Sequence, residues 1–168
     1  MNLDYTKEQD MLRKSVDEFL SKECPFDDVR EIEDSESGFS AAKWKKMAKL
    51  GWMELYFPEE YGGLGDPFGD VAIIMEEMGK KAFPSPFFST VIQCGLILLA
   101  GGSDKQKKEL LPKIAAGKLI MSLAQLEEEG SYRATGINLP AQRAAGGFIL
   151  NGIKMFAMDA NIADKLIV

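Results

Sequence analysis

Hydrophobic positions in the first part of the chain recur at helical spacing. Thr6 and Gln9 form a capping box, and apolar residues follow at helical intervals until Pro25 ends the run. Ser40 can cap a second helix. The acidic stretch between them, DDVREIEDSESG, predicts a solvated loop with at most a short helix.

Three further helical patterns follow. A stripe of apolar residues over 71–78 predicts a third helix. The segment 89–100 is apolar on nearly every side, which predicts a helix buried among others. A second capping box, Ser103 with Gln106, begins one more helix. About five helices in residues 1–117, joined by short connections, predict a mainly α protein built on a helical bundle.

The period changes after residue 117. LIMSLAQLE is a β-like apolar run, and the chain closes on the strand-forming residues DKLIV. Asn151-Gly152 predicts a hairpin turn. A strand needs neighbours that satisfy its backbone, and KLIV would otherwise be an unpaired edge. We therefore expect residues 118–168 to be an incomplete β domain and the sequence to be the front part of a longer protein.

The segment FPEEYGGLGDP, residues 57–67, predicts a structured connection between two helices. Its three glycines permit positive φ, and Asp66-Pro67 predicts an N-cap followed by proline at the first helical position. Glu59 and Glu60 are not interpreted as an acid/base pair, because adjacent carboxylates in a polar loop stay solvated and ionised. Tyr61 either packs within this connection or contacts a ligand.

Composition removes several classes of function. The chain of 168 residues has a net charge of −6 and no histidine. The acidic balance argues against nucleic acid, and the missing histidine excludes Ser-His-Asp hydrolysis, Cys-His catalysis and histidine-ligated metal from this chain alone. We predict no metal site. The N-terminus lacks a signal peptide, and the longest apolar stretch, CGLILLAGG, is too short to cross a membrane.

The two cysteines indicate a reducing compartment. Cys24 and Cys94 are isolated and have no CxxC spacing, so free thiols explain them better than a disulfide. Cys94 lies within an apolar run and is interpreted as a small buried residue. A cytoplasmic protein is the expectation.

Five segments in a fixed order carry a resemblance. They are LGWMELYFPEEYGGLG, IIMEEMGK, GSDKQKKELLPKIAAGKL, SLAQLEEE and GFILNGIKMF. Together they resemble the acyl-CoA dehydrogenase family across essentially the whole chain. The resemblance implies an N-terminal helical domain over 1–117 and the start of a β-barrel-like middle domain over 118–168, with the C-terminal helical domain absent. It also implies that the glycine segment helps to frame the acyl-CoA and flavin cavity.

The resemblance also implies an activity. In this family a carboxylate removes the α-proton of an acyl-CoA thioester while the β-hydride passes to FAD, and the electrons leave through an electron-transfer flavoprotein. The catalytic glutamate of most members lies in the C-terminal domain, beyond Val168, so no residue here is assigned as catalytic. This stretch alone is expected to be inactive.

The flavin-facing segments depart from the family pattern. The resemblance places Leu123, Gln125, Leu126, Phe156 and Met158 at the cofactor. Leu126 and Met158 replace hydroxyls that would hydrogen-bond the flavin ring, whereas backbone amides could still hold the ring and Phe156 could still stack on it. The alternative is that Leu126, Phe156 and Met158 are core residues of a β domain that binds no flavin. Ser131 is the expected substrate-binding residue.

These departures are similar to one branch of the family, the small subunits of two-component enzymes such as pimeloyl-CoA dehydrogenase. In that branch too the strand like LAQLEEEGSY lacks the usual Thr-Glu-Pro. Two functions therefore stay open, an FAD-dependent acyl-CoA dehydrogenase and a non-catalytic partner of a larger dehydrogenase subunit. Both imply an oligomer.

Overall fold

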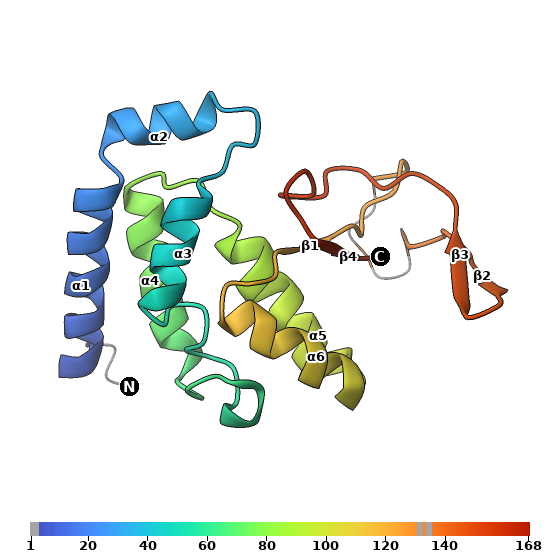
Figure 1. Ribbon diagram of the computed structural model, residues 1–168, viewed down its shortest axis with the longest axis horizontal. Coiled ribbons are helices and arrows are strands. Elements are labelled where there is room, and N and C mark those ends of the chain that lie inside the picture. The colour runs from blue at the N-terminus through green and yellow to red at the C-terminus, as the bar shows by residue number, and fades with distance from the viewer. Residues whose placement is uncertain (1–3, 131–132, 134–135) are drawn as a thin grey trace.

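The computed structural model describes residues 4–130, 133 and 136–168 (Figure 1). Helices dominate the first two thirds of the chain, as predicted, and short strands follow. In the described ranges the α-helices are α1 (Lys7–Glu23), α2 (Phe26–Glu33), α3 (Ala41–Lys49), α4 (Phe68–Lys80), α5 (Gly95–Gly101) and α6 (Asp104–Ala115), joined by a 3-10 turn η1 (Glu59–Tyr61) and a π-helix η2 (Phe88–Cys94).

Helix starts follow the sequence closely. Both predicted capping boxes are present, with Thr6 bonded to the Gln9 amide at the start of α1 and Ser103 bonded to the Gln106 amide at the start of α6. The start of α4 differs from the prediction by one residue. Pro67 is the N-cap itself and makes no side-chain cap, so α4 begins after the proline and not on it.

The acidic stretch contains α2, a helix of eight residues. Val29 and Ile32 are its buried residues, and they attach it to the core. Figure 1 shows α2 lying across one end of the helical part. The short-helix option of the sequence prediction is the one observed, because two apolar positions three residues apart give the segment a face to bury.

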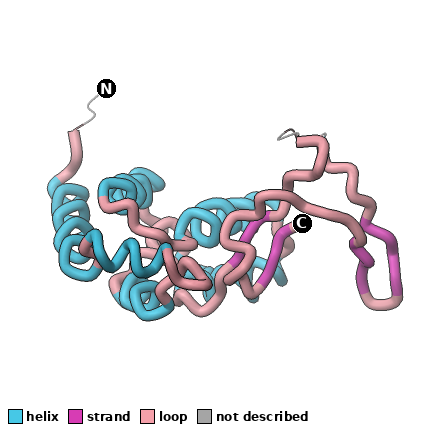
Figure 2. The backbone as a smooth tube through the Cα atoms, turned by 90° about the horizontal axis from the view of Figure 1, so that it is seen from above, coloured by secondary structure: helices cyan, strands magenta, loops and turns pink. Residues whose placement is uncertain are grey.

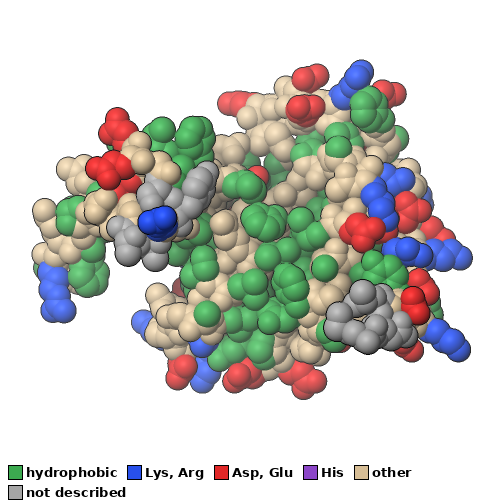
Figure 3. Space-filling model, turned by 180° about the vertical axis from the view of Figure 1, so that it is seen from behind, with side chains coloured by type: hydrophobic (Ala, Val, Ile, Leu, Met, Phe, Trp, Pro, Cys, Tyr) green, Lys and Arg blue, Asp and Glu red, His purple; other side chains and the backbone are tan. Residues whose placement is uncertain are grey.

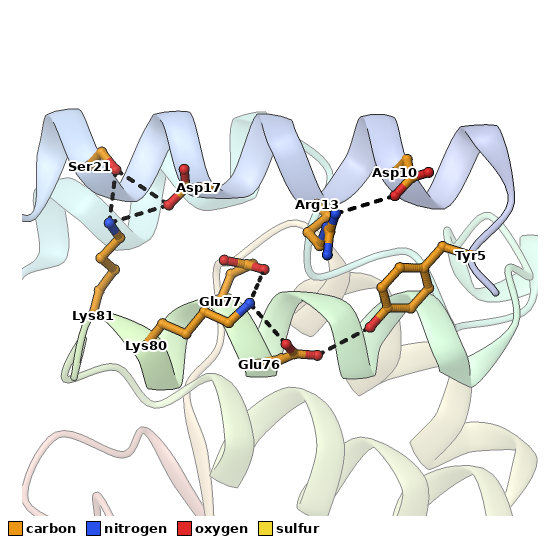
Figure 4. Close-up of polar contacts among 9 residues, drawn as sticks. All are labelled: Tyr5, Asp10, Arg13, Asp17, Ser21, Glu76, Glu77, Lys80 and Lys81. Carbon is orange, nitrogen blue, oxygen red and sulfur yellow. Dashed lines mark hydrogen bonds and ion pairs between the residues drawn. The ribbon is translucent and has the colours of Figure 1, made fainter. Parts of the chain in front are cut away.

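Polar contacts fasten α1 to α4 (Figure 4). The Tyr5 hydroxyl donates to Glu76 at 3.2 Å, and Lys81 of the α4 C-cap lies 3.2 Å from Asp17. Lys80 contacts both Glu76 and the buried Glu77, at 2.9 and 2.7 Å. The Tyr5 and Lys81 contacts link the segment of α1 to that of α4, whereas the two Lys80 contacts lie within α4.

The glycine segment folds back on its own aromatic residue. A Cβ at Gly63 would lie 1.9 Å from the Phe57 carbonyl oxygen, so only glycine fits there. Phe57 is buried, and a Cβ at Gly95 would meet its ring at 2.7 Å. Tyr61 is buried as well, which favours packing over ligand contact. The segment therefore joins two parts of the helical core.

The predicted buried helix is two joined elements, η2 and α5. Val91, Cys94 and Leu98 are buried, and Cys94 is a core residue as expected. Phe88 and Ile97 are exposed, so the segment is not covered on all sides. Figure 3 shows apolar side chains gathered over the middle of the face seen from behind.

The described strands form two separate pairs. β1 (Met121–Leu123) pairs in parallel with β4 (Lys165–Ile167), so the end of the chain is not an unpaired edge on that side. β2 (Ala141–Ala144) and β3 (Gly147–Leu150) form an antiparallel hairpin. Figures 1 and 2 show this hairpin standing away from the helices, beyond β1 and β4.

The hairpin turn lies at residues 145–146, and the prediction of a turn at Asn151-Gly152 is wrong. Gly146 has φ of +86°, whereas neither Asn151 nor Gly152 has a positive φ. The favoured two-residue hairpin turns need a left-handed backbone. A Cβ at Gly152 would lie 2.3 Å from a Leu139 methyl carbon, which is the movable end of that side chain.

One buried hydroxyl joins the helices to the strands. Thr90 of η2 donates to the Met121 carbonyl and accepts from the Met121 amide, each at 3.0 Å. Thr90 is fully buried. Both bonds go to a single residue of β1, so the hydroxyl acts as a strand neighbour for the start of β1.

We expect Thr90→Val to lower the free energy of unfolding by about 2 to 3 kcal/mol, because a buried amide and carbonyl lose their partner. Urea denaturation measures the loss, and hydrogen exchange should locate it at the Met121 amide. Thr90→Ser keeps the hydroxyl and is the control for the lost contact. Equal stabilities of the Val variant and the native protein would contradict this role.

Candidate functional site

A small hollow lies where the π-helix meets β1 and the segment that precedes β4. Its volume is about 100 Å³. Two stretches about thirty residues apart line it together with one residue of η2. The lining residues are Gln93, Leu123, Gln125, Leu126, Met155 and Phe156.

Four of the five residues predicted at the cofactor meet here. Leu123, Gln125, Leu126 and Phe156 share the hollow. Met158 is not among its lining residues, and its side chain is exposed. Ser131, the predicted substrate-binding residue, lies outside the described residues.

The two stretches are held together by backbone and hydroxyl contacts. The Met155 amide donates to the Leu126 carbonyl at 2.7 Å. The Ser122 hydroxyl, which comes from β1, donates to the Met158 carbonyl at 2.5 Å. The carbonyl of Met158 therefore has a structural role while its side chain turns away.

Phe156 has the most unusual conformation in this region. Its φ is +49°, which a bulky residue rarely adopts, and its side chain is 85% exposed. Asp159 also has a positive φ, +59°, and its carboxylate accepts from the buried Ser89 hydroxyl at 2.5 Å. An anchored turn thus supports a strained, outward-facing aromatic ring, an arrangement that is typical of functional positions.

The alternative that Leu126, Phe156 and Met158 are all core residues holds for only one of these three residues. Leu126 is buried, at 8% exposure. Phe156 and Met158 are not core residues in the described structure, since more than half of each side chain is exposed. The hollow thus has a buried apolar floor and an exposed aromatic wall.

Glu127 organises the polar side of the same segment. Its carboxylate accepts from Lys154 at 2.7 Å and from the amides of Leu139 and Asn138 at 2.9 Å. These bonds, the one from Lys154 first, hold the pKa of Glu127 at about 2. Glu128 and Glu129 are exposed beside it. Only two of the three consecutive acids therefore present free charge to a ligand.

The hollow fits the edge of a planar aromatic ring in part. Apolar walls and an exposed phenyl ring suit such a ligand, and the carboxamides of Gln93 and Gln125 supply polar groups. At Leu126 and Met158 there is no side-chain hydroxyl to add to them. The set of residues favours contact with a ring through stacking, amides and backbone.

Sequence reasoning missed Gln93 and Met155. Gln93 had a signal, because it is the one amide within the apolar run TVIQCGLILLA. Met155 had none, since its place follows from the bond between its amide and Leu126.

Other chemistries find no support in the described part of the chain. It contains no group of three acidic, cysteine or histidine side chains placed to hold a metal ion. None of its helices is long and apolar enough to cross a membrane. Cys24 and Cys94 are buried free thiols, and burial raises their pKa to about 11 and about 12.

Comparison with known proteins decides the family. The family model described as acyl-CoA dehydrogenase, N-terminal domain, matches residues 6–118. The chain belongs to the acyl-CoA dehydrogenase family. The family match covers α1 to α6 and therefore the helical part that supports the hollow.

Individual acyl-CoA dehydrogenases match along the whole chain. The probable acyl-CoA dehydrogenase YngJ of Bacillus subtilis is 32% identical, over 100% of this chain and 44% of its own length. An acyl-CoA dehydrogenase from Bacillus anthracis, solved in complex with FAD, has a TM-score of 0.88 at 28% identity, over 98% of this chain and 29% of that one. The ChsE4-ChsE5 complex from Mycobacterium tuberculosis has a TM-score of 0.84 at 29% identity, over 99% and 42%. The chain spans less than half the length of each of these proteins.

In this acyl-CoA dehydrogenase chain the bonds of Glu127 should depend on pH. Its folded pKa of about 2 lies below the ordinary 4.5, so its stabilising effect is complete above about pH 4.5 and is lost as the pH falls towards 2. We expect Glu127→Gln to speed hydrogen exchange at the Asn138 and Leu139 amides at neutral pH. Glu128→Gln, at an exposed neighbour, is the control. Unchanged exchange in the Glu127 variant would contradict the assignment.

Proposed function

We propose that this chain forms the N-terminal helical domain and the first part of the flavin-binding β domain of an acyl-CoA dehydrogenase. The enzyme would use FAD to convert an acyl-CoA thioester to the 2,3-enoyl-CoA. The observation that carries the proposal is the hollow, where Leu123, Gln125, Leu126 and Phe156 converge from two separate stretches. We place the domain boundary at 117–118, and the end of the family match at residue 118 supports it.

Phe156 is the residue that would stack on the flavin ring. Its exposed ring and its left-handed backbone, next to a turn anchored by Ser89, support this role. Leu123 and Leu126 would provide an apolar surface, and the carboxamide of Gln125 would lie at the edge. The cofactor supplies hydride acceptance, and the residues of this chain bind and orient it.

Other parts of the reaction are assigned by family likeness. Ser131 stays the proposed substrate-binding residue, and Met158 the proposed outer neighbour of the ring. The whole enzyme would also supply the base that removes the α-proton and the contact with an electron-transfer flavoprotein. Neither role is assigned to a described residue of this chain. We propose a cytoplasmic location, with which the two free, buried thiols agree.

The second candidate function is that of a non-catalytic partner in a two-component enzyme. The observation that favours it is the absence of side-chain hydroxyls at Leu126 and Met158, which leaves part of the flavin edge to other donors. The likeness to the ChsE4-ChsE5 complex adds support. In this case a larger dehydrogenase subunit would complete a shared site, and the assembly would be symmetric.

The stacking role predicts a weaker cofactor complex when the ring is removed. Phe156→Ala in the native full-length protein should raise the dissociation constant for FAD about fivefold, since an aromatic contact contributes about 1 kcal/mol. Flavin fluorescence titration measures it. Phe148→Ala removes another exposed phenyl ring, on the hairpin, and should leave the affinity unchanged. Equal effects of the two substitutions would contradict the role of Phe156.

The two candidate functions differ in their assemblies. Co-expression with a neighbouring acyl-CoA dehydrogenase subunit, followed by affinity purification and mass measurement, separates them. A flavin-loaded homo-oligomer that oxidises acyl-CoA alone supports the first function. A flavin-loaded hetero-oligomer, from a chain that binds no flavin alone, supports the second. A native protein that binds no FAD in either form would remove both.

A further inference from the structure

Gln93 is a half-buried polar residue with an unused side chain. It lines the hollow with Leu126 and Phe156. Within the described stretches of the chain, its carboxamide has no hydrogen-bond partner. A carboxamide has two donor hydrogens and an acceptor oxygen, and those of Gln93 stay open to solvent at the hollow, where a ligand can reach them. Gln93 therefore offers both a donor and an acceptor to a ligand in the hollow.

The π-helix points Gln93 towards the site. Ser89 and Thr90, earlier in η2, bind Asp159 and Met121 and so face the strand region. Gln93 follows Ser89 by four residues and lies on the same side of the helix. Single π-helical turns frequently occur at functional sites.

The chemistry of the lining selects the ligand class. Leu123, Leu126 and Met155 are apolar, and Phe156 offers an aromatic face. No lining residue is cationic, and the nearby Lys154 is occupied by Glu127 and by the Gln125 carbonyl. An anion therefore has no counter-charge here. A neutral planar ring with an amide-like edge matches both the walls and the carboxamide, which can donate and accept at such an edge.

We propose that Gln93 hydrogen-bonds the amide-like polar edge of the flavin ring and so supplies a side-chain contact that Leu126 and Met158 cannot make. The inference rests on the proposed function, because the flavin is the planar ring which that function brings to this hollow. Gln93 would thus be a cofactor-binding residue of the helical domain, in addition to the predicted positions in the strand region.

The test compares Gln93→Met with the native full-length protein, isolated with its partner subunit if it has one. Methionine keeps the length of the side chain and removes both the donor and the acceptor. We expect the dissociation constant for FAD to rise about fivefold, as for one lost neutral hydrogen bond, and the visible absorption bands of bound flavin to shift. Gln142→Met, at an exposed residue of β2, makes the same exchange away from the hollow and should change neither quantity.

Thermal denaturation without FAD checks that the variants fold equally well. If Gln93→Met does not fold, Gln93→Asn, which shortens the reach of the amide, replaces it with the same expected direction. A native protein that binds FAD while Gln93→Met binds it equally, with unchanged absorption bands, overturns the role of Gln93 and leaves the proposed function standing. A native protein that binds no FAD, alone or with a partner subunit, overturns both.

Discussion

The arrangement of helices and strands depends on the hydrogen bonds between the Thr90 hydroxyl of the helical part and Met121 of the first strand. β1 is only three residues long and pairs with β4 on one side, so it cannot hold its place alone. Thr90 satisfies both the amide and the carbonyl of Met121 from inside the helical core. The neighbouring Ser89 anchors the turn after Phe156 through Asp159. Two adjacent hydroxyls of one π-helix thus position both stretches that form the hollow.

The helical half was readable from the sequence because its signals are local. Capping boxes and apolar spacing lie within a few residues of the elements they define, and the structure follows them at Thr6 and Ser103. The strand half depends on distant contacts. Asn151-Gly152 is a strong hairpin signal, yet the turn falls at 145–146, where the backbone of Gly146 is left-handed. The local signal fails at Asn151-Gly152, because neither residue takes the positive φ that such a turn needs.

The candidate site shows the same division. Family likeness identified Leu123, Gln125, Leu126 and Phe156, and the structure brings them together. They lie together because the Met155 amide donates a hydrogen bond to the Leu126 carbonyl, and no sequence pattern in either stretch predicts this bond. Gln93 did have a signal in the sequence, because it is the single amide in an apolar run. A polar residue that breaks such a run without a partner inside the fold is a useful signal for a binding position.

We propose that η2, β1 and the segment 154–159 act as one unit that binds the flavin. Hydrogen–deuterium exchange of the native protein, with and without saturating FAD, tests this proposal. We expect slower exchange over residues 88–94, 121–126 and 154–159 when FAD is bound, and unchanged exchange in the hairpin at 141–150. FAD binding that leaves these three segments unchanged, or that protects the hairpin in their place, would contradict it.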